Sequence, residues 1–264
     1  MRMPGRVAAA IEVLTEVQDR HRPASEALKD WGKAHRFAGS GDRNAIGTLV
    51  YDALRHLNSA AAAGGSETAR SIIFGTLKTV WHLNLDEIAI LCDAQHGPTP
   101  LSEMEKQALS VDVELSDPVI AGNIPQWLEP SLRQVFGKKL IEEMSALAER
   151  APIDMRVNPL KSARDQLLTA LEKFGAVAGP LSQQSVRIPA PAQDGKHISV
   201  ESEPAHGQGW FEVQDTASQI AAALTGVRPG QNVADICAGA GGKTLALAAL
   251  MQNKGNIVAH DTDR

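Results

Sequence analysis

The first half of the chain repeats apolar residues with the period of an α-helix. From residue 7 to about residue 147 they return every three or four positions, as at Ile11, Leu14 and Val17. This spacing places the apolar side chains on one face of each helix, where they can pack against a neighbour. We therefore expect an all-helical domain in this region.

Several helix boundaries can be predicted within this region. Ser102 and Glu105 have the three-residue spacing of a capping box, in which each side chain bonds to the other residue's backbone N–H. Further helix starts are expected at Ser25 and, after the turn at residues 39–41, at Asp42. Glycine and proline at residues 64–65 and 97–100 are expected to separate helices.

Beyond residue 150 the pattern becomes that of a mixed α and β structure. Residues 154–158 alternate with period two, which predicts a strand, and a helical pattern then runs to Gly175. Two more strands are expected near residues 185–189 and 197–201. This order predicts a small α+β module of the split βαβ kind.

A strand, loop, helix and strand follow a predicted linker at residues 207–209. The expected elements of this segment are a helix at 216–224, a strand at 232–237, a helix at 245–251 and a strand at 256–260. Glycines in the loop permit positive φ angles and let a ligand approach the backbone, and the next helix offers unpaired N–H groups to negative charge. Asp261 follows the second strand, where an acid can accept the hydroxyls of a ribose. The segment is therefore predicted to bind a nucleotide cofactor.

Three nucleotide-binding motifs can be compared with this loop. A phosphate-binding Walker loop matches at Gly242, Lys243 and Thr244 but needs its first glycine at Cys237. The dinucleotide pattern Gly-x-Gly-x-x-Gly needs a small residue at Thr244. The methyltransferase pattern of an acid and alternating small residues fits at Asp235, Cys237, Gly239 and Gly241. We favour the methyltransferase hypothesis, with a nucleoside triphosphate site and a βα turn without ligand as alternatives.

Longer motifs in the sequence resemble those of a known family. Residues 235–244 read Asp-Ile-Cys-Ala-Gly-Ala-Gly-Gly-Lys-Thr, and with residues 209–218 they strongly resemble the Sun/RsmB-type RNA cytosine-5 methyltransferases. Gly239 and Ala240 stand where that family usually has Ala-Pro. Residues 155–161 are similar to the opening of the family's small RNA-recognition-like module. Residues 21–25, 39–43, 49–51 and 54–55 resemble the NusB-like RNA-binding domain that precedes some of these enzymes.

The resemblance implies a multidomain protein. The expected parts are an all-α NusB-like RNA-binding domain at 1–145, a small α+β module at 150–205, and the first part of an α/β Rossmann-like methyltransferase domain at 206–264. The implied activity is methylation of carbon 5 of cytosine in RNA with S-adenosylmethionine, and ribosomal RNA is the usual substrate for this domain order. The residues expected to bind the cofactor are Cys237, Ala238, Gly239, Ala240, Gly241, Gly242, Lys243 and Asp261. RNA contacts are expected at Arg156, Asn158 and Lys161, with a strand-end turn held by the asparagine as the alternative.

The family's reaction uses a cysteine thiolate that attacks carbon 6 of the cytosine, and no residue of this sequence is predicted to do so. Cys237 belongs to the cofactor loop, and Cys92 shares a helical face with Ile88 and Leu91, which predicts a buried, inert thiol. The family's catalytic cysteine segments are expected beyond Arg264, so the 264-residue chain is predicted to be inactive alone. The alternative is a non-catalytic NusB-like RNA-binding protein with a degenerate methyltransferase remnant.

Composition narrows the compartment and the partners. The chain is 43% hydrophobic and 22% charged, which is globular, and its two cysteines indicate a reducing cytoplasm without structural disulfides. Glu12 and Glu16 interrupt the apolar N-terminus, so neither a secretory signal nor a membrane span is expected. Residues 1–60 carry nine Lys/Arg against seven Asp/Glu, whereas the rest carry 17 against 24, which allows an anionic partner or a solvated surface near the N-terminus. The eight histidines show no metal-ligand spacing, and no metal is expected.

Overall fold

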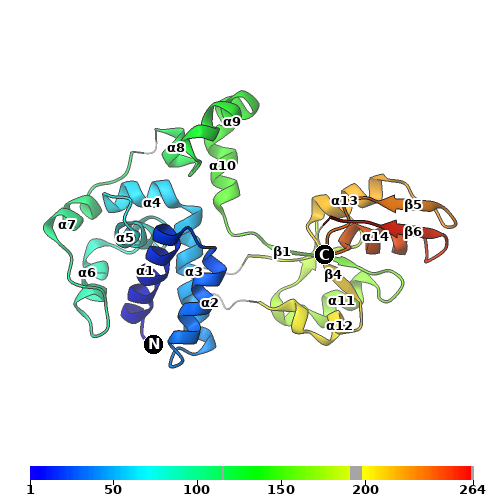
Figure 1. Cartoon of the computed structure of the whole chain (residues 1–264), viewed down its shortest axis with the longest axis horizontal. Helices are drawn as coiled ribbons and strands as arrows, with labels where there is room; N and C mark the ends of the chain where they lie inside the picture. The colour runs from blue at the N-terminus through cyan, green and yellow to red at the C-terminus, as the bar shows by residue number, and fades with distance from the viewer. Residues whose placement is uncertain (115, 191–197, 263–264) are drawn as a thin grey trace. The chain divides into compact units, whose positions relative to one another are not determined.

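The chain forms two compact units. A computed structural model describes residues 1–114, 116–190 and 198–262. Within the described residues, the first unit comprises residues 1–150 and the second comprises 151–190 and 198–262 (Figure 1). Because the second unit contains both the predicted α+β module and the glycine-loop segment, the division into three domains stays a prediction.

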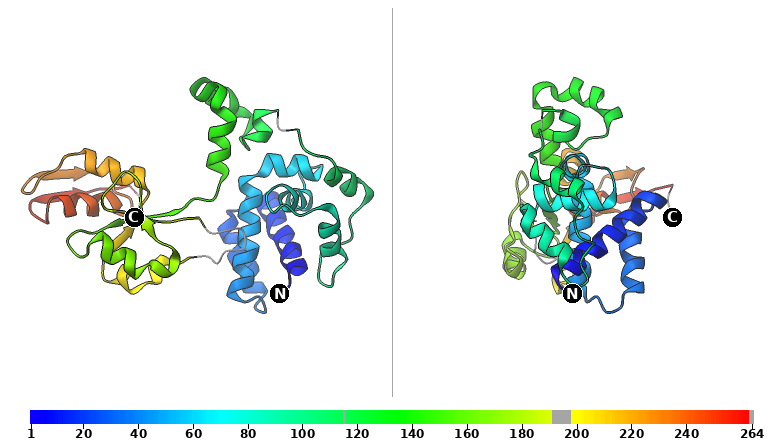
Figure 2. Two further views of the ribbon diagram at one scale, coloured as in Figure 1. Left: turned by 180° about the vertical axis from the view of Figure 1, so that it is seen from behind. Right: turned by 90° about the vertical axis from the view of Figure 1, so that its left-hand side faces the viewer.

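Within the described residues, the regular secondary structure of the first unit is entirely helical, which confirms the predicted fold class of this region. Helices α1, α3 and α5 pack against one another, and Figure 2 shows this group from two further sides. The helices are α1 (Met3–Arg20), α2 (Ala24–Ala34), α3 (Ser40–Arg55), α4 (Leu57–Gly64), α5 (Ala69–Thr79), α6 (Leu85–Asp93), α7 (Glu103–Ser110), α8 (Pro118–Ala121), η1 (Gln126–Leu128), α9 (Glu129–Phe136), η2 (Gly137–Lys139) and α10 (Leu140–Ala148).

Two hydrophobic cores stabilise the first unit. The larger core lies among α1 to α7 and includes Phe74, Leu14 and Ile46, each no more than 1% exposed. The smaller core joins α8, α9 and α10 through residues such as Leu140 and Met144. The N-terminal helices thus form a closed structure with its apolar faces turned inward.

The predicted helix boundaries are confirmed in part. The capping box is present, since Ser102 N donates to Glu105 Oε2 at 2.8 Å and Glu105 N donates to Ser102 Oγ at 3.3 Å. The start at Ser25 is wrong, because α2 begins at Ala24, directly after Pro23. The start at Asp42 is wrong by two residues, because α3 already begins at Ser40.

Asp42 stabilises the start of α3 and the N-terminus of the chain together. Its carboxylate accepts hydrogen bonds from Gly39 N at 3.3 Å, from the Met1 amino group at 2.8 Å and from Arg6 Nη2 at 2.7 Å. The Met1 amino group and the Arg6 guanidinium lower the pKa of Asp42. The acid therefore has a structural role in a helix cap and an ion pair.

The second unit begins with a four-stranded antiparallel sheet. Its strands are β1 (Ile153–Val157), β2 (Val177–Ala178), β3 (Ser185–Ile188) and β4 (Phe211–Val213), in the order β2-β3-β1-β4. Helix α11 (Arg164–Ala170) and the 3₁₀ turn η3 (Glu172–Phe174) follow β1 and end at Gly175 with φ +69°. The α+β character of the predicted module is confirmed.

One predicted strand of this module is wrong. Residues Val200–Ser202 form the 3₁₀ turn η4, and residue 197 lies outside the described residues. Val200 is only 3% exposed because it packs onto the core of the sheet, so its burial does not require strand pairing. The edge position beside β1 is taken by β4, which follows the short helix α12 (Pro204–Gly207).

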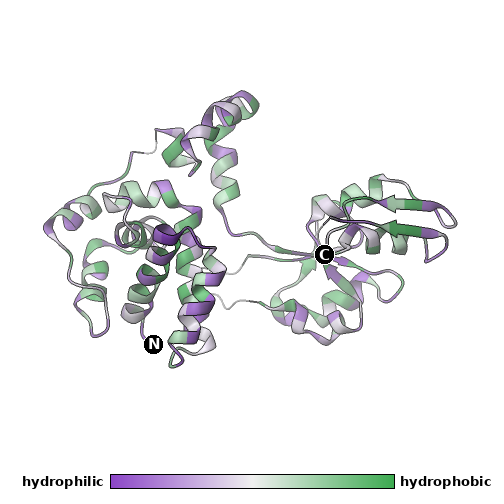
Figure 3. Ribbon diagram, in the orientation of Figure 1, coloured by the Kyte–Doolittle hydropathy of each residue, from purple (hydrophilic) through white to green (hydrophobic). Residues whose placement is uncertain are grey.

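The last part of the second unit has the predicted order of strand, loop, helix and strand, but its helix begins at Gly242, three residues before the predicted start. Helix α13 (Thr216–Leu224) precedes β5 (Asn232–Asp235), α14 (Gly242–Leu250) and β6 (Asn256–Ala259), and β5 and β6 are parallel. A small core joins α13, α14 and the two strands through Ala222, Ala246 and Leu247. Figure 3 shows the apolar character of β6, whose Val258 is 67% exposed.

Candidate cofactor site

The candidate site is the loop between β5 and α14 together with the end of β6. Parallel pairing places Asp235, the last residue of β5, opposite Ala259 of β6. His260 N donates to Asp235 O at 2.8 Å, and Ala238 N donates to His260 O at 3.0 Å. The loop and the end of β6 are therefore held at one edge of the sheet, where ligands bind in parallel α/β structures.

Two glycines give the loop its backbone conformation. Gly239 has φ +53° and Gly241 has φ +85°, and a Cβ atom at either residue would meet nothing within 4 Å. The positive backbone angle therefore favours glycine at both residues, and steric crowding adds nothing to this preference. A ligand can approach the backbone of both residues.

Two carboxylates fix the loop from either side. Thr244 Oγ1 donates to Asp235 Oδ2 at 2.6 Å, which ties the first turn of α14 to the end of β5. Gly239 N donates to Asp261 Oδ2 at 2.7 Å, which ties the middle of the loop to the segment after β6. The residue predicted to bind ribose thus lies beside the residues predicted to contact the rest of the cofactor.

The first turn of α14 faces the end of the loop. Gly241 is the N-cap and has no side chain to bond to the first N–H groups of the helix. These N–H groups have no acceptor within the helix, and they carry its positive dipole end. Lys243 lies in this turn with an exposed side chain. The turn can accommodate a negatively charged group.

The two cysteines differ in their surroundings. Cys237 lies exposed in the loop, as expected for a residue of the candidate site. Cys92 is 3% exposed in α6, and burial raises the pKa of its thiol to about 11, which confirms the predicted buried, inert thiol. The buried Cys92 is therefore not placed as an activated nucleophile.

The three residues predicted to contact RNA are in different environments. Arg156 is only 4% exposed on β1, so its guanidinium does not face solvent. Asn158 holds a turn, because its Nδ2 donates to Gly209 O at 3.2 Å and its Oδ1 accepts from Leu160 N at 3.1 Å. Lys161 is exposed on the same turn. The geometry leaves Lys161 as the accessible member of the three.

A buried polar cluster beside the loop was not predicted from the sequence. Asp154 on β1 accepts from Arg187 Nε at 2.6 Å and from Thr216 Oγ1 at 2.7 Å, which connects the sheet to the start of α13. Gln214 accepts from Arg156 Nε at 2.8 Å through its Oε1. The period-two pattern of residues 154–158 was the signal available, because it placed Asp154 and Arg156 on the same face of a strand.

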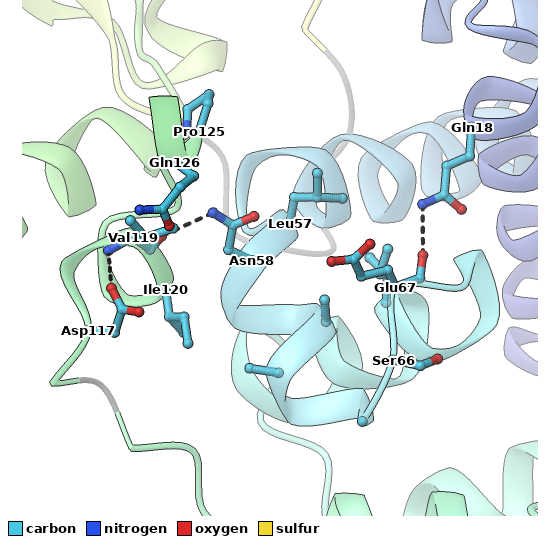
Figure 4. A pocket seen from close by; sticks show the side chains of 14 residues that line it. Gln18, Leu57, Asn58, Ser66, Glu67, Asp117, Val119, Ile120, Pro125 and Gln126 are labelled. Carbon is cyan, nitrogen blue, oxygen red and sulfur yellow. Dashed lines mark hydrogen bonds between the residues drawn. The ribbon is translucent and has the colours of Figure 1, made fainter. Parts of the chain in front are cut away.

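The first unit contains a cavity of about 660 Å³ between α4 and the segment around α8 (Figure 4). Asn58 Nδ2 donates to Val119 O at 3.0 Å and to Ile124 O at 2.7 Å, and Gln18 Nε2 donates to Glu67 O at 3.0 Å. These amides join segments of the helical unit.

In the part of the chain that the structure describes, no helix is long and apolar enough to cross a membrane. Among the same residues, no group of three or more His, Cys, Asp or Glu side chains is placed to hold a metal ion.

Comparison with known proteins finds methyltransferases. Residues 124–193 match the ferredoxin-like domain of RsmF/B-like methyltransferases. The ribosomal RNA small subunit methyltransferase B of Pseudomonas syringae pv. tomato is 32% identical over 164 residues, which are 61% of this chain and 35% of that protein. The protein of the same name in Pseudomonas putida is 30% identical over 189 residues, which are 71% of this chain and 40% of that protein. The chain thus spans well under half the length of these relatives.

A solved structure shows the same fold. The crystal structure of PH0851 matches with a TM-score of 0.65 at 20% identity, and the match covers 100% of this chain and 65% of that one. The helical, α+β and βαβ parts therefore occur together in another protein.

Proposed function

Because the chain is related to the Sun/RsmB-type methyltransferases, we propose that residues 232–262 begin a Rossmann-like domain that binds S-adenosylmethionine. The complete protein would methylate carbon 5 of a cytosine in ribosomal RNA. The observation that carries this proposal is the bond from Gly239 N to Asp261 Oδ2 at 2.7 Å. It brings the acid after the second strand to the glycine loop after the first, as a nucleoside cofactor requires.

The residues of the site fit this cofactor. Asp261 would accept the ribose hydroxyls, and residues 237–243 would contact the rest of the molecule through backbone groups that the two positive-φ glycines leave open. The cofactor supplies a methyl group on a positively charged sulfur. The chain supplies the binding loop and the helix N-terminus that orient it.

RNA binding is proposed for the helical unit, as a NusB-like domain, and for the turn that carries Lys161. In the helical unit, Trp31 stacks on His35 with ring centroids 4.2 Å apart, and His35 meets Phe37 edge-on at 5.7 Å. Phe37 is 71% exposed. An exposed aromatic ring such as Phe37 can stack with an unpaired RNA base.

No catalytic residue is assigned. Attack on carbon 6 of cytosine requires an accessible, activated thiolate. Cys92 is buried with a raised pKa, and Cys237 lies in the cofactor loop. We predict that the 264-residue chain binds the cofactor without transferring its methyl group. The relatives do not favour the alternative of a non-catalytic RNA-binding protein.

Calorimetric titration of the chain with S-adenosylmethionine, ATP and NAD tests the cofactor assignment. We expect binding of S-adenosylmethionine alone, with affinity reduced at least tenfold in Asp261→Asn because a charged acceptor of the ribose is lost. Asp112→Asn is the matched control, since the Asp112 side chain is fully exposed in the first unit. Binding of ATP in preference to S-adenosylmethionine would overturn the proposal.

A further inference from the structure

Gln214 is fixed between the sheet and the candidate cofactor loop. It follows β4 and precedes α13, and it is 8% exposed. Its backbone N donates to Asp154 O at 3.0 Å, and its backbone O accepts from Gln219 Nε2 at 2.9 Å. These bonds hold the backbone of Gln214 from both sides.

The side-chain amide of Gln214 has a defined orientation. Its Oε1 accepts from Arg156 Nε at 2.8 Å, and an arginine has only donors to offer. The amide oxygen must therefore face Arg156, and Nε2 must point away from it. Within the described residues, Nε2 donates no hydrogen bond.

This unpaired donor points at the start of α14. Gln214 Nε2 lies 3.3 Å from the position that a Cβ atom on Gly242 would occupy. Gly242 is the first residue of α14, a nine-residue helix whose first N–H groups have no intrahelical acceptor. A glycine at this position lets the amide lie against the helix backbone.

Arg156 adds a second unpaired donor and a positive charge. It is 4% exposed, and its Nη2 is fully enclosed without a hydrogen-bond partner among the described residues. A buried donor without an acceptor is destabilising in the free protein. The unpaired Nε2 of Gln214 beside the N-terminus of α14 indicates an acceptor supplied by a ligand.

The ligand group that accepts from Gln214 Nε2 and the start of α14 should be a carboxylate. Asp261 and Gln214 border different parts of the loop, one at Gly239 and the other at Gly242. A cofactor whose ribose lies at Asp261 can place its other end at Gly242, and in S-adenosylmethionine that end is an amino acid. Its carboxylate offers the negatively charged acceptor that the helix N-terminus and the amide favour.

We propose that Gln214 Nε2 and the first N–H groups of α14 bind the carboxylate of the cofactor's amino-acid moiety, with Arg156 as a positioning residue that orients the Gln214 amide. This inference rests on the proposed function and adds a specificity determinant from outside the glycine loop. It also gives the buried Arg156 a role that does not require contact with RNA.

The test compares two ligands that differ at this end. S-adenosylhomocysteine carries the amino-acid carboxylate, whereas 5′-methylthioadenosine has the same nucleoside and sulfur without it. Both are titrated calorimetrically into the 264-residue chain and its variants. We expect Gln214→Ala to weaken S-adenosylhomocysteine binding about tenfold or more and to leave 5′-methylthioadenosine binding unchanged.

A second variant separates ligand binding from folding. Gln214→Glu keeps the size of the side chain and pairs with Arg156, so thermal stability should be maintained or raised while the ligand carboxylate is repelled. Arg156→Lys keeps the charge but loses the fixed planar donor set, and should weaken S-adenosylhomocysteine more than 5′-methylthioadenosine. Asp261→Asn should weaken both ligands.

Each outcome has a distinct meaning. Equal losses for both ligands in Gln214→Glu, or no loss for either, would overturn the carboxylate assignment while the cofactor site itself stands. Failure of the unaltered chain to bind either ligand would overturn the proposed function together with this inference. Selective loss of S-adenosylhomocysteine binding supports both.

Discussion

The helical unit and the βαβ segment contrast in how completely they bury their apolar residues. In α5, Ile72, Ile73 and Phe74 are each at most 1% exposed, because helices cover them on several sides. In the βαβ segment, Ile236 is 73% exposed and Val258 67%. A two-stranded sheet has few neighbours with which to cover its residues. The two regions are therefore not expected to be equally stable, although both have the predicted helices and strands. The glycine loop lies in the less buried region.

The largest effect is expected for Phe74→Ala in the core of the helical unit. Phe74 is 1% exposed, so its loss leaves a cavity and should lower the free energy of unfolding of this unit by about 3–5 kcal/mol. Urea denaturation followed by far-UV circular dichroism measures the change. Phe37→Ala is the matched control, because Phe37 is 71% exposed. Equal losses for the two variants would contradict the described core.

A smaller, pH-dependent effect is expected at Asp154 in the second unit. The Arg187 guanidinium and then the Thr216 hydroxyl lower the pKa of Asp154 in the folded state. The stabilisation is therefore present above the ordinary value of 3.8 and is lost as the pH falls through the lower folded value. Asp154→Asn should cost about 1–3 kcal/mol at neutral pH and flatten the loss of stability in acid.

Hydrogen exchange in increasing urea, measured by mass spectrometry on peptides from β1 and β3, reports the stability of the second unit separately from that of the first. Asp112→Asn serves as the control because its side chain is fully exposed. An unchanged pH dependence in Asp154→Asn would show that the ion pair does not stabilise the sheet.

A smaller effect still is expected in the loop. Gly241→Ala forces a side chain onto a residue with φ +85° and should destabilise the βαβ segment by about 1–2 kcal/mol. Gly207→Ala has open space and no positive φ, so it should be close to neutral. Exchange rates of amides in β5 and β6 report the difference. Similar behaviour of the two variants would argue against the loop conformation.

The smallest perturbation is chemical labelling of the cysteines without mutation. In the folded chain at mildly alkaline pH, Cys237 should react with a thiol reagent while Cys92 does not, since Cys92 is buried and its pKa is about 11. Absorbance of the released thiol product should count one cysteine in buffer and two in denaturant. S-adenosylmethionine should slow the reaction of Cys237. Rapid reaction of both thiols would show that the helical core opens readily.

Local elements were predictable wherever the pattern depended on neighbouring residues. The boundaries of α13 were predicted without error, and the capping box at Ser102 and Glu105 is present, because both depend on bonds within a few residues. The strand expected at residues 197–201 is wrong for its described part because burial of Val200 beneath the sheet produces the same apolar pattern as a strand.

The sequence by itself determined the helical character of the first unit, the βαβ order around the glycine loop, and the family resemblance. Each of these depends only on short-range periodicity or on the spacing of residues in a motif. Only the tertiary structure decided that β4 pairs with β1, that Arg156 is buried, and that the Gln214 amide faces Gly242. These contacts join residues that are distant along the chain, and a local pattern cannot specify which distant groups meet. The candidate site was therefore predictable as a loop, whereas the residue proposed to complete it was not.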